Sequence, residues 1–157
     1  MMGGIFDQLG GKIISIVGVA LVSALLIAVL SMTKSANIPQ ELMYMTMRIQ
    51  QLYSGSVDYS GVDNATVINA GLVPKNLLKG TSIKHAFNGD ITIAPGDSNE
   101  TFTFTLTNIP KDECVTLANN KMNSWVSVAI NGSVIGSDVS TVVNACTDKN
   151  TLIFEAQ

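Results

Sequence analysis

From Ile13 to Met32 the chain reads IISIVGVALVSALLIAVLSM, twenty residues without a charge, bounded by Lys12 and Lys34. At about 1.5 Å per residue, a helix of this length spans roughly 30 Å, the thickness of the hydrocarbon core of a bilayer. A small protein seldom buries a helix that is apolar on every face. The run is also longer than the apolar region of a cleaved secretory signal, about 7–15 residues. We therefore predict a retained membrane helix over residues 13–32.

Small residues line one side of this predicted membrane helix. Ala20, Ala24 and Ala28 lie four residues apart, a spacing that lets helices approach closely in lipid. Gly18 is a weak point at which the helix could unwind locally. The residues expected to make the apolar contacts of the helix are Ile13, Ile16, Val17, Gly18, Ala20, Leu21, Ala24, Leu25, Ala28 and Val29.

The segment before the membrane helix contains a single acidic residue, Asp7. Two interpretations of it remain open. Asp7 is either a solvated charge at the membrane interface, or it pairs with Lys12 or with a free α-amine. Such a pair is much stronger in a low dielectric than in water.

A second helical pattern follows the apolar run. Leu42, Met45, Ile49 and Leu52 recur at spacings of three or four residues, which predicts an amphipathic helix that packs against the rest of the chain. Together the two patterns predict one long helix over residues 5–53, with a break or bend near Pro39. We divide the chain into a stem, residues 1–53, and a globular head, residues 54–157.

The head has the pattern of an α+β domain with an antiparallel sheet. Thr101–Asn108 alternates threonine with Phe102, Phe104 and Leu106, as a half-buried strand does. Asn131-Gly132 is a strong signal for a type I′ hairpin turn. The expected helices are 64–70, capped by Asp63 or Asn64, 110–120, and a helix or turn at 139–145. The expected strands are 91–94, 101–108, 125–130, 133–135 and 152–154. The stem helix is expected to cover the open face of this sheet.

Composition argues against several classes of function. The net charge is −3 and the isoelectric point about 4.9, so nucleic acid is not an expected partner. One histidine and two cysteines leave little material for a metal or haem site, and we expect no cofactor. His85 has no acidic partner in its sequence neighbourhood and is expected to be structural or at the surface. Since the motifs of nucleophilic and phosphate-binding enzymes are absent, we do not expect an enzyme.

Cys114 and Cys146 lie on the same side of the predicted membrane helix. A head outside the cytoplasm would be in an oxidising compartment, which favours a disulfide between them. Such a bridge would close a loop of about thirty residues and stabilise the fold by roughly 3–4 kcal/mol. Two buried free thiols are the alternative. No base is evident near either residue, so we do not expect a catalytic thiol.

Taken together, these features resemble a type IV pilin, and local motifs resemble the type IVb subgroup. The motifs are Tyr53-Ser54-Gly55, Asp58-Tyr59-Ser60, Ala70-Gly71-Leu72-Val73-Pro74, Phe87-Asn88-Gly89-Asp90-Ile91, Phe102–Asn108, Ile109-Pro110, Cys114 and Cys146. The resemblance covers essentially the whole chain. Within the subgroup, the chain is most similar to the major pilins of thin conjugative pili of I-complex plasmids.

This resemblance implies a structural filament subunit. A prepilin peptidase would process the precursor, with Met1 as the expected mature start, and residues 13–32 would hold it in the inner membrane with a periplasmic head. Pilus assembly machinery would then extract it into a helical homopolymer, an extracellular pilus, in which the apolar helices form the core and melt locally near Gly18. Its role would be adhesion between cells or to a surface, including stabilisation of mating pairs in conjugation.

The chain departs from the family pattern at one position. Type IV pilins usually carry a glutamate a few residues after the cleavage site, which pairs with the N-terminal amine of a neighbour. With Met1 as the start, Ile5 occupies that place. Asp7 is the nearest substitute, and we expect it to pair with Lys12 or with an amine of an adjacent subunit.

Three other interpretations remain open at this point. A minor pilin or pseudopilin would share the fold. A membrane-anchored periplasmic binding domain would not polymerise. An anchored enzyme would need a dense polar pocket around His85.

Overall fold

The computed structural model describes residues 37–120 and 125–157. The predictions for the 13–32 membrane helix, for Gly18 and for the pair Asp7 and Lys12 lie outside the described residues. Among the helices within the two described ranges, none combines the length and the hydropathy that crossing a membrane requires.

The described part begins with a helix over residues 37–52, which we call the long helix. The labelled elements follow it in the order α2 (Asn64–Asn69), β1 (Leu78–Lys79), β2 (Ser82–Ile83), β3 (Ile91–Pro95), β4 (Phe102–Ile109), α3 (Lys111–Asn119), β5 (Trp125–Ile130), β6 (Ser133–Val134), α4 (Val139–Ala145) and β7 (Asn150–Ala156). Every predicted helix and strand of the head is present. The short β1–β2 hairpin was not predicted, because two-residue strands carry no periodic signal.

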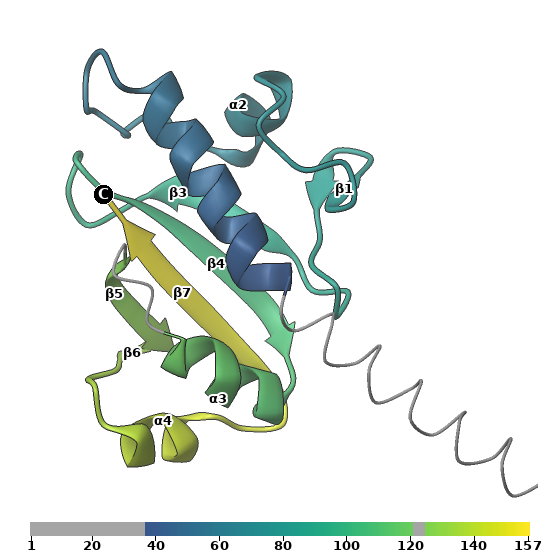
Figure 1. Ribbon diagram of the computed structural model, residues 1–157, viewed down its shortest axis with the longest axis vertical. Helices are drawn as coiled ribbons and strands as arrows, with labels where there is room; N and C mark the ends of the chain where they lie inside the picture. Colours follow the sequence, from purple (N-terminus) through teal and green to yellow (C-terminus); the bar gives the residue numbers. More distant parts are fainter. Residues whose placement is uncertain (1–36, 121–124) are drawn as a thin grey trace, which may run out of the picture. The chain divides into compact units, whose positions relative to one another are not determined.

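Five of the strands form one antiparallel sheet in the order β3-β4-β7-β5-β6. The long helix lies across one face of this sheet, and α3 and α4 lie at the end of the sheet nearest the N-terminal end of that helix (Figure 1). The arrangement confirms the predicted α+β class. The last strand is longer than the predicted 152–154, since it runs from Asn150 to Ala156 and lies between β4 and β5.

The alternation of buried and less buried side chains along β4 determines which face of the sheet packs against the core. Phe102, Phe104 and Leu106 are fully buried, and the threonines between them lie on the other face. Their cross-strand partners on β7 include Phe154 and Leu152, which are also buried. The predicted inward and outward sides of this strand are therefore confirmed.

The long helix supplies the other side of the core. Leu42, Met45 and Ile49 are buried together with Ile38, as the three-and-four spacing predicts. Leu52 was expected to share this role, but its side chain is 48% exposed. It is the last helical residue, and the chain turns away immediately afterwards, so no core side chain covers it.

Pro39 lies within the helical residues of the first turn described, a position that proline tolerates. The bend predicted near Pro39 depends on residues before 37, outside the described range. The described residues form one compact unit. The expected division between stem and head at residue 53 marks the end of the long helix, but the compact unit includes this helix, because its side chains contribute to the core.

Local sequence explains the turns and caps. Asn131 and Gly132 have φ values of 50° and 86°, as the predicted type I′ turn requires. Asp63 caps α2 by accepting a hydrogen bond of 2.7 Å from the Thr66 amide. Of the two capping candidates, Asp63 therefore performs this role.

Asn64 instead binds the outer edge of the sheet. Its side-chain Nδ2 donates to the Ile91 carbonyl at 3.0 Å, and its Oδ1 accepts from the Ile93 amide at 2.6 Å. These two groups belong to the free side of edge strand β3. A single amide side chain thus satisfies backbone groups that would otherwise be open to another strand.

We expect Asn64→Asp to lower the free energy of unfolding by about 1–2 kcal/mol, because a carboxylate cannot donate to Ile91 and that carbonyl loses its partner. The matched control is Asn69→Asp on the exposed end of the same helix. Urea unfolding followed by fluorescence of Trp125 measures both. Equal midpoints for the two variants would contradict the role of Asn64.

Candidate functional site

The described residues contain no arrangement typical of catalysis. Within residues 37–120 and 125–157, no group of three or more histidine, cysteine, aspartate or glutamate side chains could hold a metal ion. Glu155 carries a nearly buried carboxylate, which accepts hydrogen bonds from Thr101 Oγ1 at 2.7 Å and from Ser127 Oγ at 2.8 Å. The Thr101 hydrogen bond is the main reason that the pKa of Glu155 lies below its usual value. This carboxylate is satisfied as a structural acceptor and is not placed to act as a base.

Cys114 and Cys146 form the predicted disulfide, with their Cα atoms 6.0 Å apart. Cys114 lies on α3, and Cys146 is the C-cap residue of α4. Both cysteines are buried. The bridge therefore fastens α3 to the end of α4 and encloses the residues between them, which include β5 and β6.

The long helix presents a second apolar side to solvent. Met43, Tyr44 and Met47 are 37%, 44% and 56% exposed, and we call them the outer helix face. The Arg48 guanidinium carbon lies 5.8 Å from the centre of the Tyr44 ring, within the range of a cation–π contact. The inner side of the same helix is buried against the sheet. The helix therefore has apolar side chains on two opposite sides, and the described residues of the chain bury only one of them.

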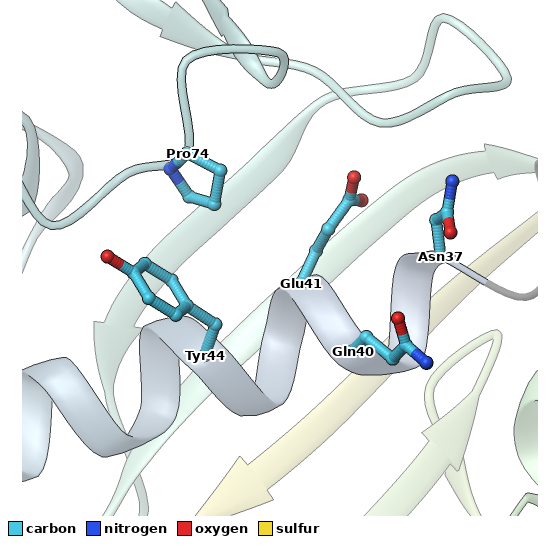
Figure 2. Close-up of a pocket in the computed structure, with 5 residues that line it drawn as sticks. All are labelled: Asn37, Gln40, Glu41, Tyr44 and Pro74. Carbon is cyan, nitrogen blue, oxygen red and sulfur yellow. The ribbon is translucent and has the colours of Figure 1, made fainter.

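An open cavity of about 330 Å³ adjoins the outer helix face. Asn37, Gln40, Glu41 and Tyr44 line it from the long helix, and Pro74 lines it from the loop opposite (Figure 2). Asn76 donates a hydrogen bond of 2.6 Å to Glu41 Oε1 at this edge. Burial nevertheless raises the pKa of Glu41 above its usual value. The lining thus contains one acidic side chain among uncharged ones, and exposed apolar side chains adjoin it.

The disulfide-enclosed segment carries its own exposed apolar side chains. Val126, Val134, Val139 and Val143 are between 42% and 73% exposed, on β5, β6 and α4. Isolated surface valines are ordinary, but four within one covalently closed segment add to the apolar area that the described surface offers.

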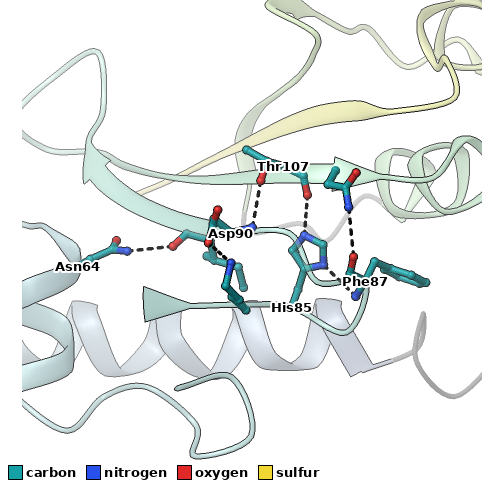
Figure 3. Close-up of polar contacts among 8 residues, drawn as sticks. Asn64, His85, Phe87, Asp90 and Thr107 are labelled. Carbon is teal, nitrogen blue, oxygen red and sulfur yellow. Dashed lines mark hydrogen bonds and ion pairs between the residues drawn. The ribbon is translucent and has the colours of Figure 1, made fainter. Parts of the chain in front are cut away.

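His85 is buried, as expected of a structural residue, and not exposed in a pocket. Its ring lies between Thr107 of β4 and Phe87 of its own loop (Figure 3). The cavity beside the outer helix face does not include His85 in its lining.

Sequence reasoning missed the outer helix face. Met43 and Met47 lie four residues apart in a methionine-rich helix, and that spacing was the available signal. Of the stripe recognised in the sequence, Leu42, Met45 and Ile49 pack into the core and Leu52 does not. The exposed apolar side chains of the outer helix face are suited to contact with another apolar surface.

Solved structures identify the class of fold. The chain is similar to the type IV pilin TcpA from Vibrio cholerae El Tor biotype, with a TM-score of 0.52 and 16% sequence identity. The match covers 80% of this chain and 98% of that one. A long helix on an antiparallel sheet with one disulfide is therefore the fold of a type IV pilin.

Sequence comparisons identify the family. Residues 32–157 match the family model described as PilS N terminal. The chain belongs to the PilS family of type IV pilins, which are structural subunits and not enzymes. It is 36% identical over 89 residues to the major structural subunit of the bundle-forming pilus of Escherichia coli O127:H6, and equally to that of Escherichia coli O111:H-. These matches cover 54% of this chain and 46% of each relative, so the chain spans about half the length of the curated relatives it matches.

Proposed function

We propose that this chain is the major structural subunit of a type IV pilus of the IVb subgroup. It polymerises into an extracellular filament after residence in the inner membrane, where its head is periplasmic. Two findings support this: the family match, and relatives that are themselves major structural subunits of a pilus. In this proposal residues 13–32 form the filament core, and Asp7 with Lys12 supplies the charges for assembly.

The structural observation that supports this proposal is the outer helix face. A helix exposing Met43, Tyr44 and Met47 to water leaves apolar area that association with further copies would bury. A homopolymer needs such a face on every subunit, because each copy must offer the same contact. The low charge of the chain, 13% of residues, limits repulsion between packed copies.

The finer role that we propose is adhesion between cells, as in the mating aggregates held together by thin conjugative pili. This part rests on the motif resemblance from Tyr53 to Cys146. A prepilin peptidase and pilus assembly machinery are the partners that it requires.

The test is electron microscopy of sheared surface filaments from cells that express the chain, with antibody labelling. We expect filaments that contain the chain in abundance. Met47→Glu on the outer helix face should lower the filament yield at least about tenfold, because packing would bury an unpaired carboxylate.

The matched control is Thr92→Glu, which adds the same charge on the opposite face of the sheet at another exposed position. We expect it to retain filaments. Trp125 fluorescence of both variants checks that the head is folded. Normal filament yield from Met47→Glu would contradict the role of the outer helix face, and absence of the chain from all filaments would overturn the proposed function. Its presence only in trace amounts would indicate a minor pilin.

A further inference from the structure

His85 begins a tight loop that connects β2 to β3, and its side chain is only 3% exposed. The backbone closes the loop on itself. The His85 amide donates to the Gly89 carbonyl at 3.1 Å, and the Asn88 amide donates to the His85 carbonyl at 3.0 Å. The position of the ring is therefore fixed by the loop that carries it.

Both ring nitrogens of His85 have partners. Nε2 lies 2.7 Å from the Thr107 carbonyl oxygen, which can only accept, so Nε2 carries a hydrogen. The Phe87 amide donates to Nδ1 at 3.2 Å, so Nδ1 carries none. These partners select one neutral tautomer of the imidazole.

The same loop is attached to β4 at further points. The Asp90 amide donates to Thr107 Oγ1 at 3.0 Å, and Asn108 Nδ2 donates to the Phe87 carbonyl at 3.4 Å (Figure 3). A Cβ atom on Gly89 would lie 1.8 Å from the Thr107 carbonyl and 2.3 Å from Nε2. The ring, the glycine and β4 are thus in close contact, and a side chain at position 89 would collide with both the ring and β4.

Two charged groups act on the ring. Lys84 Nζ and Asp90 Oδ1 form an ion pair at 2.6 Å, and the carboxylate favours a positive imidazole while the ammonium opposes it. The β4 residues that contact the loop here, Thr107 and Asn108, are neutral. Burial is the largest effect and lowers the pKa of His85 below its usual value.

We propose that His85 is an acid-operated latch: the neutral ring fastens residues 84–90 to β4, and protonation releases them. A proton taken from hydronium binds Nδ1, water is left, and the Phe87 amide loses its acceptor. The positively charged ring is then buried, and its Nδ1–H faces the N–H of Phe87, so that two donors oppose each other. Residues 84–90 form the last part of the connection between the long helix and the sheet, so release loosens that connection.

The sign of the pH dependence follows from the lowered pKa. The unfolded chain takes up the proton first, near the ordinary histidine pKa of about 6.5. The stabilising contribution of the latch is therefore complete above that pH and is lost as the pH falls from there toward the lower pKa of the folded state.

The experiment is an NMR titration of the isotopically labelled full-length chain in detergent micelles, from pH 7.5 to pH 4.5. The sequence has one histidine, so the imidazole signal is unambiguous. We expect the ring to titrate with a midpoint below 6.5, and the amide signal of Phe87 to leave its native position with the same midpoint. In His85→Gln the Phe87 signal should stay constant over this range.

Two matched variants separate the latch from the neighbouring ion pair. Asp90→Asn and Lys84→Gln both remove that pair, yet the first should lower the His85 midpoint and the second should raise it. A purely structural effect of losing the pair would move both midpoints in the same direction. The proposal is overturned if the ring titrates while Phe87 keeps its native signal, or if His85→Gln shows the same transition. Should His85→Gln not fold, the Phe87 amide decides in the other two variants: its transition should move with the shifted His85 midpoint in each, and a Phe87 transition that stays at the native midpoint overturns the latch.

Discussion

Replacing Cys114 and Cys146 together by serine is expected to lower the free energy of unfolding by about 3–4 kcal/mol, because the open loop regains its conformational entropy in the unfolded chain. The two cysteines are 32 positions apart. The loss is large for a domain of this size, whose total stability is typically about 5–15 kcal/mol. Opening the bridge also removes the covalent link between α3 and the end of α4, so the segment with β5 and β6 is then held by non-covalent contacts alone.

The measurement is urea unfolding of the full-length chain in mild detergent, followed by the fluorescence of Trp125, the single tryptophan. A reducing agent should shift the midpoint of the native protein to that of the double variant and leave the double variant unchanged. If reduction leaves the native midpoint in place, the bridge contributes nothing to stability and the prediction is wrong.

The second large effect is expected on the inner side of the long helix. Leu42 is 1% exposed and contributes to the core, so Leu42→Ala should lower the free energy of unfolding by about 2–5 kcal/mol through lost burial and the cavity that remains. Leu52→Ala removes the same atoms from a half-exposed position on the same helix. Its cost should stay below about 1 kcal/mol.

The two leucine variants share residue type, helix and assay, so the difference between their midpoints isolates burial. Equal losses of unfolding free energy would mean that Leu52 is buried like Leu42, as the sequence pattern predicted. Unequal losses in the expected order would support the helix end that the structure places at residue 52.

Sequence patterns predicted what depends on periodicity and local chemistry. The alternation around Phe104 defined a strand with two distinct faces, and the Asn131-Gly132 pair defined a turn whose φ values only such residues adopt readily. The disulfide was predictable because the chain has two cysteines and a head expected outside the cytoplasm. In each case the information lies within a few residues or in a very small set of candidates.

Other features depended on tertiary neighbours and were not predictable. Asn64 was a capping candidate by position, but its amide binds β3 almost thirty residues later. Tyr59 was noticed only as part of a family motif, whereas its ring lies 5.3 Å from that of Tyr53 and 4.8 Å from that of Phe102, joining the end of the long helix to the core. His85 gave no local signal of its partner, because Thr107 is 22 residues away.

The place of β7 in the sheet has a consequence for the order in which the head forms during synthesis. β3 and β4 can pair as soon as both have been made, and so can β5 and β6, but β4 and β5 have no common neighbour until β7 follows them. Until β7 is made, each hairpin therefore has an unpaired strand edge, and such edges can pair with the wrong strand. We infer that the head closes in one late step, when its middle strand enters between two halves that are already built.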